Sequence, residues 1–509
     1  MNHDGLVVRG LKHAGWSSAD YLVLPLLWFL TTPFFVRALG EDLYGIWMLV
    51  NALIAFSSLL GLGMSDAAVR FISRSAPPGD KETVSVMVRS IGTVYLIVGV
   101  VTAGLTYALA PLLVTMPFRV APVLVGEATT AVRVGSVIAA ARLLDTLFVS
   151  VLQGFERFDL MAKVRGPFQV LTMLLNVVIV LNGGGVDAVL AATFIVLLLS
   201  LMTKVVMVRS RLLPGLSLRL SISRSVLRRV MPFSFNSWVQ GLGSLLSGQV
   251  DRLLVASIAG STALTYYAVC VSLAQQIHAL LSHSFAFLLP MTSGKVLEDD
   301  KSVLRRIFFN AMNGVTLIAL GLGIPLFLAA NQLLTLWIDS SFAVEATGLL
   351  EVFVVVFVLL STSIVPHYMM NATALYPLNT LLGLANGAVI ALSTFVLIPV
   401  AGIAGAAFAR LFGLPVSLIG RAAVHRRLLG DHRRMGPFVI FVPIISIFGF
   451  LYLIEAPSLI MVASPWILFA VIGISTAIGV FASWRFLRRY NTIPPAAGSG
   501  VGSVDESMS

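Results

Sequence analysis

The chain has 509 residues, of which 58% are hydrophobic and only 11% are charged. Soluble domains carry about 25% charged residues, so this composition excludes a soluble globular protein. The single cysteine, Cys270, excludes an internal disulfide framework, and a net charge of +11 is typical of loops between membrane spans rather than of a nucleic-acid-binding surface.

The apolar runs predict an all-α integral membrane protein of about fourteen transmembrane helices, because a span needs about 20 mainly apolar residues. In chain order the predicted spans cover approximately residues 17–36, 43–64, 90–115, 128–152, 166–183, 186–208, 232–258, 262–290, 307–330, 347–370, 377–397, 401–424, 437–455 and 465–484. The first run is too long for a cleavable signal segment and is interpreted as a retained helix. The tail at 491–509 is rich in Ala, Gly and Ser and is predicted to be disordered.

The distribution of Lys and Arg predicts that both termini lie in the cytoplasm. With that orientation, 28 of the 34 Lys and Arg residues fall in the termini and inner loops. These include the residues from Lys204 to Arg229 and from Arg421 to Arg434. Such a bias toward one side sets orientation in membrane proteins. All outer loops are short, so the chemistry is expected to lie within the helical bundle.

A short internal similarity predicts two related halves. Gly40 and Gly260 each end a predicted helix at the outer face, and an aromatic residue, Trp47 or Tyr267, follows seven residues later. The shift of 220 residues spans six predicted helices. We therefore expect six-helix lobes at 1–210 and 211–430, followed by two additional helices at 431–490. Trp47 and Tyr267 are expected to belong to an aromatic belt.

Three segments carry a resemblance to a known family. Residues 32–45 read Thr-Pro-Phe-Phe-Val-Arg-Ala-Leu-Gly-Glu-Asp-Leu-Tyr-Gly, residues 61–71 begin Gly-Leu-Gly-Met, and residues 251–255 read Asp-Arg-Leu-Leu-Val. These segments resemble Wzx-type oligosaccharide and polysaccharide flippases of the multidrug/oligosaccharidyl-lipid/polysaccharide exporter superfamily. The general layout extends the resemblance over residues 1–430.

The resemblance implies a V-shaped, two-lobe transporter of the bacterial inner membrane that works by alternating access. Its cargo would be an undecaprenyl-diphosphate-linked oligosaccharide used for O-antigen, capsule or exopolysaccharide synthesis. A polysaccharide polymerase and a chain-length regulator are possible partners. Lipid II flippases of the same superfamily also have fourteen helices, so that alternative stays open.

Four arginines within predicted spans are candidates for holding an anionic cargo. They are Arg133, Arg142, Arg252 and Arg410. Intramembrane ionisable residues usually face a cavity or a partner, and the planar guanidinium matches phosphate oxygens. The alternative is simple neutralisation, since Asp145 follows Arg142 by three residues on the same helical face.

The intramembrane carboxylates are candidates for coupling transport to H⁺ or Na⁺. They are Asp145, Asp251 and Glu351, with His278 and His367 as further groups that could take a proton. The sequence contains no Gly-x-x-x-x-Gly-Lys-Ser/Thr loop, so nucleotide hydrolysis by that route is not expected. No cofactor, metal centre or nucleic-acid partner is predicted.

Two rival functions share some of these features. A drug or metabolite antiporter of the same superfamily would have the same fold, but a cavity with several arginines disfavours cationic cargo. A membrane enzyme acting on lipid-linked sugar would use acids in an outer loop, where Glu41 and Asp42 lie. Such an enzyme usually needs a large outer loop, and this chain has none. We therefore predict a transporter and not an enzyme.

Overall fold

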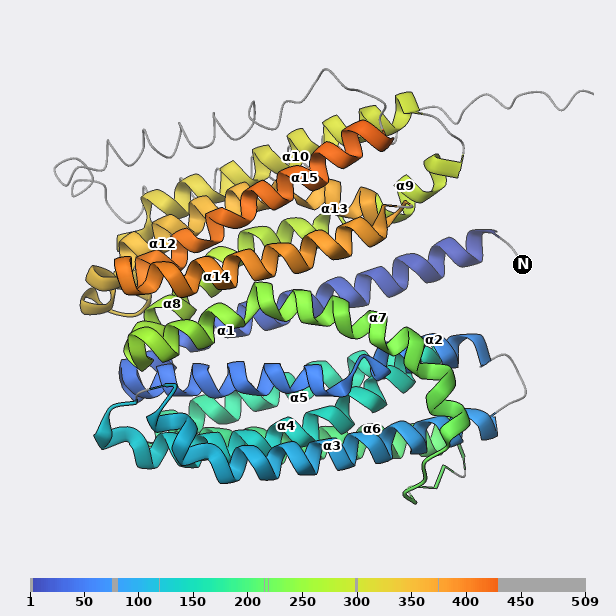
Figure 1. Ribbon diagram of the computed structural model, residues 1–509, viewed down its shortest axis with the longest axis horizontal. Helices are drawn as coiled ribbons and strands as arrows, with labels where there is room; N and C mark the ends of the chain where they lie inside the picture. The colour runs from blue at the N-terminus through green and yellow to red at the C-terminus, as the bar shows by residue number, and fades with distance from the viewer. Residues whose placement is uncertain are drawn as a thin grey trace, which may run out of the picture.

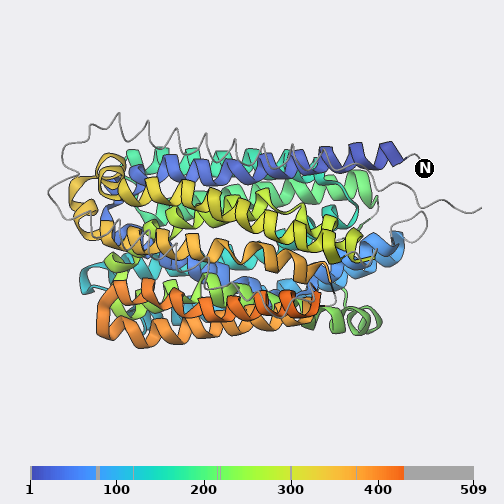
Figure 2. The same cartoon turned by 90° about the horizontal axis from the view of Figure 1, so that it is seen from above.

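The computed structural model describes residues 3–428 except 76–80, 119, 215, 218, 298–300 and 374. Within that part the protein is an elongated bundle of helices that run along its long axis in both views (Figures 1 and 2). The main helices are α1 (His3–Phe56), α2 (Met64–Ser75), α3 (Lys81–Thr115), α4 (Val125–Gly154), α5 (Phe158–Leu181), α6 (Val186–Met207), α7 (Arg224–Gly248), α8 (Val250–Ser284), α9 (Leu288–Leu297), α10 (Lys301–Leu328), α11 (Ala330–Trp337), α12 (Ser340–Ser361), α13 (Ile364–Asn371), α14 (Tyr376–Ala409) and α15 (Leu414–Ala423). Shorter helical turns are η1 (Ser57–Gly61), η2 (Pro122–Leu124), η3 (Val208–Leu212), η4 (Arg410–Gly413) and η5 (Val424–Leu428).

Nine helical stretches of the described residues are long and apolar enough to cross a membrane. Three of them contain a backbone break, because α1, α8 and α14 each merge two helices across a glycine with positive φ. These glycines are Gly40 (φ 78°), Gly260 (φ 92°) and Gly402 (φ 59°), and only glycine adopts such angles without strain. Figure 1 shows the chain turning back on itself at the broken ends of α1 and α14.

The helices form two groups that lie side by side in Figure 1. We call them the N-terminal group (residues 41–212), with α3, α4, α5 and α6, and the C-terminal group (residues 224–428), with α7, α8, α10 and α12 to α15. Within the first group α4 packs against α3 and α6, and within the second α12 packs against α8 and α10. Contacts between the groups run from α1 to α8 and from α2 to α7.

Local sequence explains several helix boundaries. The Asp339 carboxylate accepts a hydrogen bond from the Phe342 N–H at 2.8 Å and caps the start of α12. The Ser341 hydroxyl donates to the same carboxylate at 2.6 Å. These bonds favour the ionised form, so they lower the pKa of Asp339. The acid therefore fixes the turn between α11 and α12.

Two spans are interrupted where the sequence predicted continuous helices. The predicted run 43–64 ends in η1 followed by Leu62 and Gly63, both with positive φ, before α2 resumes. The predicted run 232–258 is broken at Gln249, between α7 and α8. The predicted helices and tail at 431–490 and 491–509 lie outside the described residues.

Candidate functional site

The two helix groups meet at the glycine-broken ends of α1 and α8. The Thr265 hydroxyl donates to the backbone oxygen of Glu41 at 2.5 Å. The Tyr266 hydroxyl donates to the Glu41 carboxylate, and the Thr262 hydroxyl donates to the Asp42 carboxylate. We call this set the outer contact. The acids Glu41 and Asp42, weighed above as an enzyme's acidic pair, therefore join the two groups.

Gly45 is what allows α1 and α8 to come this close. A Cβ added at Gly45 would lie 1.9 Å from the Ser261 backbone oxygen and 2.9 Å from the Thr265 hydroxyl oxygen. Any side chain at this position would force the two backbones apart. The outer contact therefore depends on a glycine that has an ordinary φ.

A second junction on the same side joins α1 to α11. The Arg37 Nε donates to the Ile338 backbone oxygen at 2.5 Å, and the Trp337 indole N–H donates to the Phe29 backbone oxygen at 2.8 Å. The Phe29 and Trp337 rings also stack, with centroids 4.8 Å apart. This junction surrounds a groove of about 280 Å³ that Arg37 shares with apolar and aromatic side chains.

At the opposite end, α2 and η1 pack against α7. The Trp238 indole N–H donates to the Leu59 backbone oxygen at 3.0 Å. A Cβ at Gly63 would lie 2.2 Å from the Ser234 backbone oxygen and 2.7 Å from the Trp238 nitrogen. We call this set the inner contact. Its backbone-to-backbone approach again requires a glycine.

Charged groups extend the inner contact toward the helix ends. The Arg70 guanidinium lies 4.4 Å above the centre of the Phe233 ring, a cation–π arrangement between α2 and α7. Asp66 on α2 accepts a hydrogen bond from Ser237, while partial burial raises the pKa of Asp66. The two ends of the interface between the groups are therefore closed by different chemistry.

A buried ion pair links α4 to α6 in the N-terminal group. The Lys204 ammonium lies 2.6 Å from the Asp145 carboxylate and is only 3% exposed. Lys204 was predicted to be an inner-loop charge, which is wrong because α6 continues past it. The direct partner of Asp145 is thus Lys204, and Arg142 contributes only a longer-range attraction.

Arg142 is exposed although it lies on the inward side of α4. That side also carries Gly135, whose Cβ would contact Val50 of α1, and Asp145, which pairs with α6. No hydrogen bond from the Arg142 side chain to another described residue occurs in the structure. Arg142 is therefore a cation with donors free to meet a ligand between α1 and α6.

Arg133 points the other way. It lies nine residues before Arg142, and nine residues at about 100° each place two side chains on opposite sides of a helix. Its guanidinium lies 4.8 Å above the Tyr107 ring of α3, and that tyrosine is 49% exposed. Its Nε is buried without a hydrogen-bond partner among the described residues. Arg133 and Arg142 thus face different spaces.

The C-terminal group contains a fully buried network of Asp251, Tyr267 and Arg410. The Arg410 Nη2 lies 2.5 Å from the Asp251 Oδ2, and the Tyr267 hydroxyl donates to the same carboxylate. Arg410 also lies 5.4 Å from the centre of the Phe357 ring. The network ties α8, η4 and α12 together, and its charges neutralise each other.

The aromatic-belt prediction for Trp47 and Tyr267 is wrong. Trp47 is 9% exposed and stacks on Phe35 with ring centres 4.7 Å apart, and Tyr267 is buried beside Asp251. Both helices turn back one to two turns before these residues, so their rings enter the bundle core instead of the membrane boundary.

The remaining predicted site residues are partly buried. Arg252 donates from Nη2 to the Ser272 hydroxyl at 3.1 Å, while its Nε is buried without a partner in the described part of the chain. Glu351 is half-buried on α12.

Arg421 is a buried cation that the sequence analysis missed. It was assigned to an inner loop, but it lies on α15 and is 5% exposed. Its Nε and Nη1 have no hydrogen-bond partner among the described residues. The signal available in the sequence was the apolar run that precedes it together with the Ala-Ala-Val that follows it, which lets the helix continue past this arginine.

Each group also encloses a cavity. The one in the N-terminal group, about 260 Å³, lies between α1, α3 and α4 and is mainly apolar. The one in the C-terminal group, about 200 Å³, is lined by polar and apolar side chains in similar measure and is described below. No three His, Cys, Asp or Glu side chains of the described residues come together as a metal-binding group.

The fold is similar to those of two solved membrane transporters. It is similar to the lipid II flippase MurJ in an inward closed conformation, with a TM-score of 0.69 at 13% identity over 93% of this chain and 98% of that one. It is also similar to an inward-facing multidrug resistance MATE family transporter of the MOP superfamily, with a TM-score of 0.62 at 16% identity over 86% and 96% of the two chains. The chain thus shares the fold of these two transporters, and the protein is a multi-pass membrane protein.

The family model for polysaccharide biosynthesis proteins matches residues 34–347, which is more than half of the chain. The chain therefore belongs to the polysaccharide biosynthesis protein family. No curated protein matches the sequence.

Proposed function

We propose that this protein moves an undecaprenyl-diphosphate-linked oligosaccharide across the bacterial inner membrane by alternating access. The observation that carries the proposal is the pair of contacts that close the interface between the two helix groups at its two ends. The outer contact consists of three hydrogen bonds beside Gly45, and the inner contact consists of one hydrogen bond and the close backbone approach at Gly63. Such contacts can be broken and remade in turn, which is what exposure of a central site to one side at a time requires.

The family supports the substrate class, since its members are described as polysaccharide biosynthesis proteins. The boundaries we propose are two six-helix lobes at 1–210 and 211–430, with further helices at 431–490, a tail at 491–509 and both termini in the cytoplasm. The equivalent breaks at Gly40 and Gly260, 220 residues apart, favour these lobes. A polysaccharide polymerase and a chain-length regulator would use the translocated product.

We propose Arg142 as the first contact of the diphosphate, because its donors are free and it lies between α1 and α6. Arg252, with an unused buried Nε, would make the second contact. Arg410 could join them only if Asp251 exchanged its partner, and Arg133 would act near the end of α4 beside Tyr107. A bidentate guanidinium suits a diphosphate better than it suits a cationic drug.

The predicted coupling groups Asp145, Asp251 and Glu351 remain part of the proposal for an H⁺ or Na⁺ gradient. The first two already neutralise a buried cation, so release of that cation would have to accompany ion binding. The main alternatives are a lipid II flippase and a cation antiporter of the same superfamily. The fold favours neither, because MurJ and MATE structures are both similar to it.

The test is the sidedness of the glycan in a gene-deletion strain. A membrane-impermeant sugar-binding probe is applied to right-side-out and inverted vesicles, and the trapped lipid is identified by mass. We expect glycan facing the cytoplasm in the deletion strain and export restored by the wild-type gene. Export that reaches the outer face normally in the deletion strain would refute the proposal, and no change in any glycan would favour the antiporter.

Variants of the two arginines of α4 sharpen the same test. Arg142→Ala should abolish export while the protein still inserts, because it removes the free cation inside the bundle. Arg133→Ala is the comparison variant, since it removes the same charge from the opposite side of the same helix, and a smaller loss of export is expected for it. Equal effects of the two variants would remove the special role of Arg142.

A further inference from the structure

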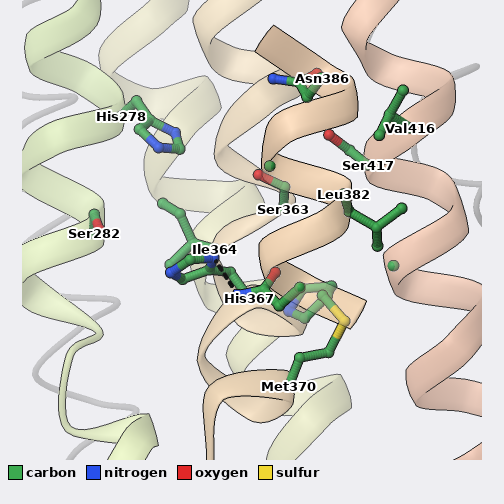
Figure 3. A pocket seen from close by; sticks show the side chains of 14 residues that line it. His278, Ser282, Ser363, Ile364, His367, Met370, Leu382, Asn386, Val416 and Ser417 are labelled. Atoms are coloured by element: carbon green, nitrogen blue, oxygen red, sulfur yellow. Dashed lines mark hydrogen bonds between the residues drawn. The ribbon is translucent and has the colours of Figure 1, made fainter. Parts of the chain in front are cut away.

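A pocket of about 200 Å³ lies inside the C-terminal group, between α8, α13, α14 and α15 (Figure 3). Two histidines from different helices, His278 of α8 and His367 of α13, line it. Its other polar lining side chains are Ser282, Ser363, Asn379, Asn386 and Ser417. Within the described part of the chain, no carboxylate, arginine or lysine lines it, so the two imidazoles are the only lining groups there that can change charge near neutral pH.

His367 lies between two amide side chains. Its Nε2 is 3.0 Å from the Asn371 Nδ2, and its Nδ1 is 3.0 Å from the Asn379 Nδ2. The two amides also contact each other, with Asn379 Nδ2 2.8 Å from Asn371 Oδ1. Each ring nitrogen of this histidine therefore has a partner that can act as donor or acceptor.

This arrangement fits both charge states of the ring. A neutral imidazole needs one donor and one acceptor, whereas an imidazolium needs two acceptors. A half-turn of an asparagine amide exchanges its oxygen and nitrogen, so Asn371 and Asn379 can satisfy either state. Because Asn371 lies on α13 and Asn379 on α14, protonation of His367 changes how these two helices are bonded to each other.

The rest of the pocket favours a single added proton. His278 lies 3.5 Å from the Ser361 hydroxyl and within electrostatic range of His367, so charging one ring opposes charging the other. The Asn386 Oδ1 is buried without a hydrogen-bond partner among the described residues. An unused acceptor beside two imidazoles suits an additional N–H donor.

Most of the charged groups on the helices around the pocket are cationic. The sequences of α9, α10, α13, α14, α15 and η5 contain no aspartate or glutamate. Asp251 of α8 is held by Arg410. The other described ionisable side chains on these helices and on the end of α8 are His283, Lys301, Arg305, Arg306, Tyr368, Tyr376, Arg421, His425, Arg426 and Arg427. Helix α12, whose Ser361 contacts His278, carries Glu345 and Glu351, and the nearer of these is ten residues before Ser361, or about 15 Å along the helix. No carboxylate of the described residues lines the pocket as a ligand for a divalent cation, and the nearby cations oppose more than one added positive charge.

We propose that this pocket binds one proton, shared between His278 and His367, and that the proton gradient acts on the transport cycle there. The inference rests on the proposed transport function and adds a coupling site to it. Asp145 and Asp251 each have a cationic partner, whereas the pocket histidines have only neutral ones. Proton binding biases the joint between α13 and α14, and release resets it.

The first experiment needs no cargo. Spin labels are attached at Ser73 of α2 and Ser225 of α7, both exposed beside the inner contact, in a Cys270→Ala background of the full chain in phospholipid nanodiscs. The distance distribution is measured between about pH 5 and pH 8, where only histidines normally titrate. We expect a pH-dependent shift in the wild type that disappears in the double variant His278→Gln/His367→Gln.

His283→Gln is the matched control, because it removes an exposed histidine from the same helix as His278. It should keep the shift. A shift that persists in the double variant overturns the proposal, as does a wild type without any shift. If the double variant fails to insert, the single variants His278→Asn and His367→Asn serve instead, and a full shift in both would overturn it.

The second experiment separates the coupling site from the transport function. Proteoliposomes containing the lipid-linked glycan recovered from the deletion strain are given a pH gradient, and the glycan reaching the opposite leaflet is measured. One proton per cycle allows up to about a tenfold acceleration per pH unit. The double variant should keep gradient-independent movement and lose the acceleration.

The outcomes distinguish the two proposals. Movement in the wild type with equal acceleration in the double variant overturns the proton site and leaves the transport function. No movement in the wild type under any gradient overturns the transport function, while the distance measurement still decides whether the pocket binds a proton.

Discussion

Replacing Gly45 by alanine should open the outer contact. The added Cβ would lie 1.9 Å from the Ser261 oxygen, so α1 and α8 must separate by about 1.1 Å to reach even 3.0 Å. The same displacement lengthens the 2.5 Å hydrogen bond from Thr265 to the Glu41 oxygen to about 3.6 Å, which is no longer a hydrogen bond. The neighbouring bonds of the outer contact would weaken with it.

The energetic consequence follows from the bonds lost. Three hydrogen bonds close the outer contact, two of them to carboxylates. At about 1 kcal/mol for the neutral bond and about 1.5 kcal/mol for each charged one, the closed state loses roughly 4 kcal/mol. This shifts the balance between closed and outward-open states by about three orders of magnitude. We expect the variant to remain folded, to accumulate in the outward-open state and to transport poorly.

A single cysteine at Leu264 reports this opening. Leu264 is fully buried beside the outer contact, and Cys270 is the only native cysteine, so Leu264→Cys in a Cys270→Ala background gives one reactive site. Gly45→Ala should raise its rate of maleimide labelling in right-side-out vesicles at least a hundredfold. Gly126→Ala is the control, because nothing lies within 4 Å of its added Cβ. An unchanged labelling rate in Gly45→Ala would refute the reasoning.

Three further predictions concern other contacts. Gly63→Ala should open the inner contact, because its added Cβ would overlap the α7 backbone. Maleimide labelling of a cysteine placed beside the inner contact, measured in inverted vesicles, checks this. An unchanged labelling rate would count against the prediction. Lys204→Met should destabilise the protein by about 3–5 kcal/mol, because it leaves the buried Asp145 carboxylate unpaired. The double variant Lys204→Met/Asp145→Leu should recover most of this loss, as measured by thermal unfolding. A double variant as unstable as the single one would contradict the role of the ion pair. Asp339→Ala should cost about 1 kcal/mol at neutral pH by removing the cap on the Phe342 N–H. Because the pKa of Asp339 is lowered on folding, its stabilisation is present above the unfolded value of about 3.9 and is lost as the pH falls through the folded value, so the difference in melting temperature should shrink below about pH 4.

The membrane class, the family and the helical breaks at Gly40 and Gly260 were accessible from the sequence. Apolar runs are strong signals because every backbone polar group in lipid must be bonded within its own helix. A glycine followed by a polar segment marks the end of such a run, and both glycines adopt positive φ.

The partners of the buried charges could not be predicted from the sequence. Asp145 and Arg142 are neighbours in sequence, yet Lys204 of another helix takes the carboxylate. Lys204 and Arg421 were assigned to loops because a span boundary cannot be set from one charge at the end of an apolar run. The rotation of each helix about its axis could not be predicted either. Spans that are apolar on all sides have no amphipathic pattern that shows which side faces the bundle interior.

The hydrogen bond between Thr262 and Asp42 joins two positions that are 220 residues apart, the same separation as between Gly260 and Gly40. Contact between equivalent positions of a repeat occurs only close to the axis that relates the copies. In an assembly of two identical subunits such a contact would place an aspartate against an aspartate. In the two-lobe repeat that we propose above, a single chain carries both copies and is free of this restriction, so one position can supply the acid and the other the hydroxyl donor. The covalent link between the halves thereby permits an asymmetric, attractive junction at the place where exact symmetry would impose repulsion.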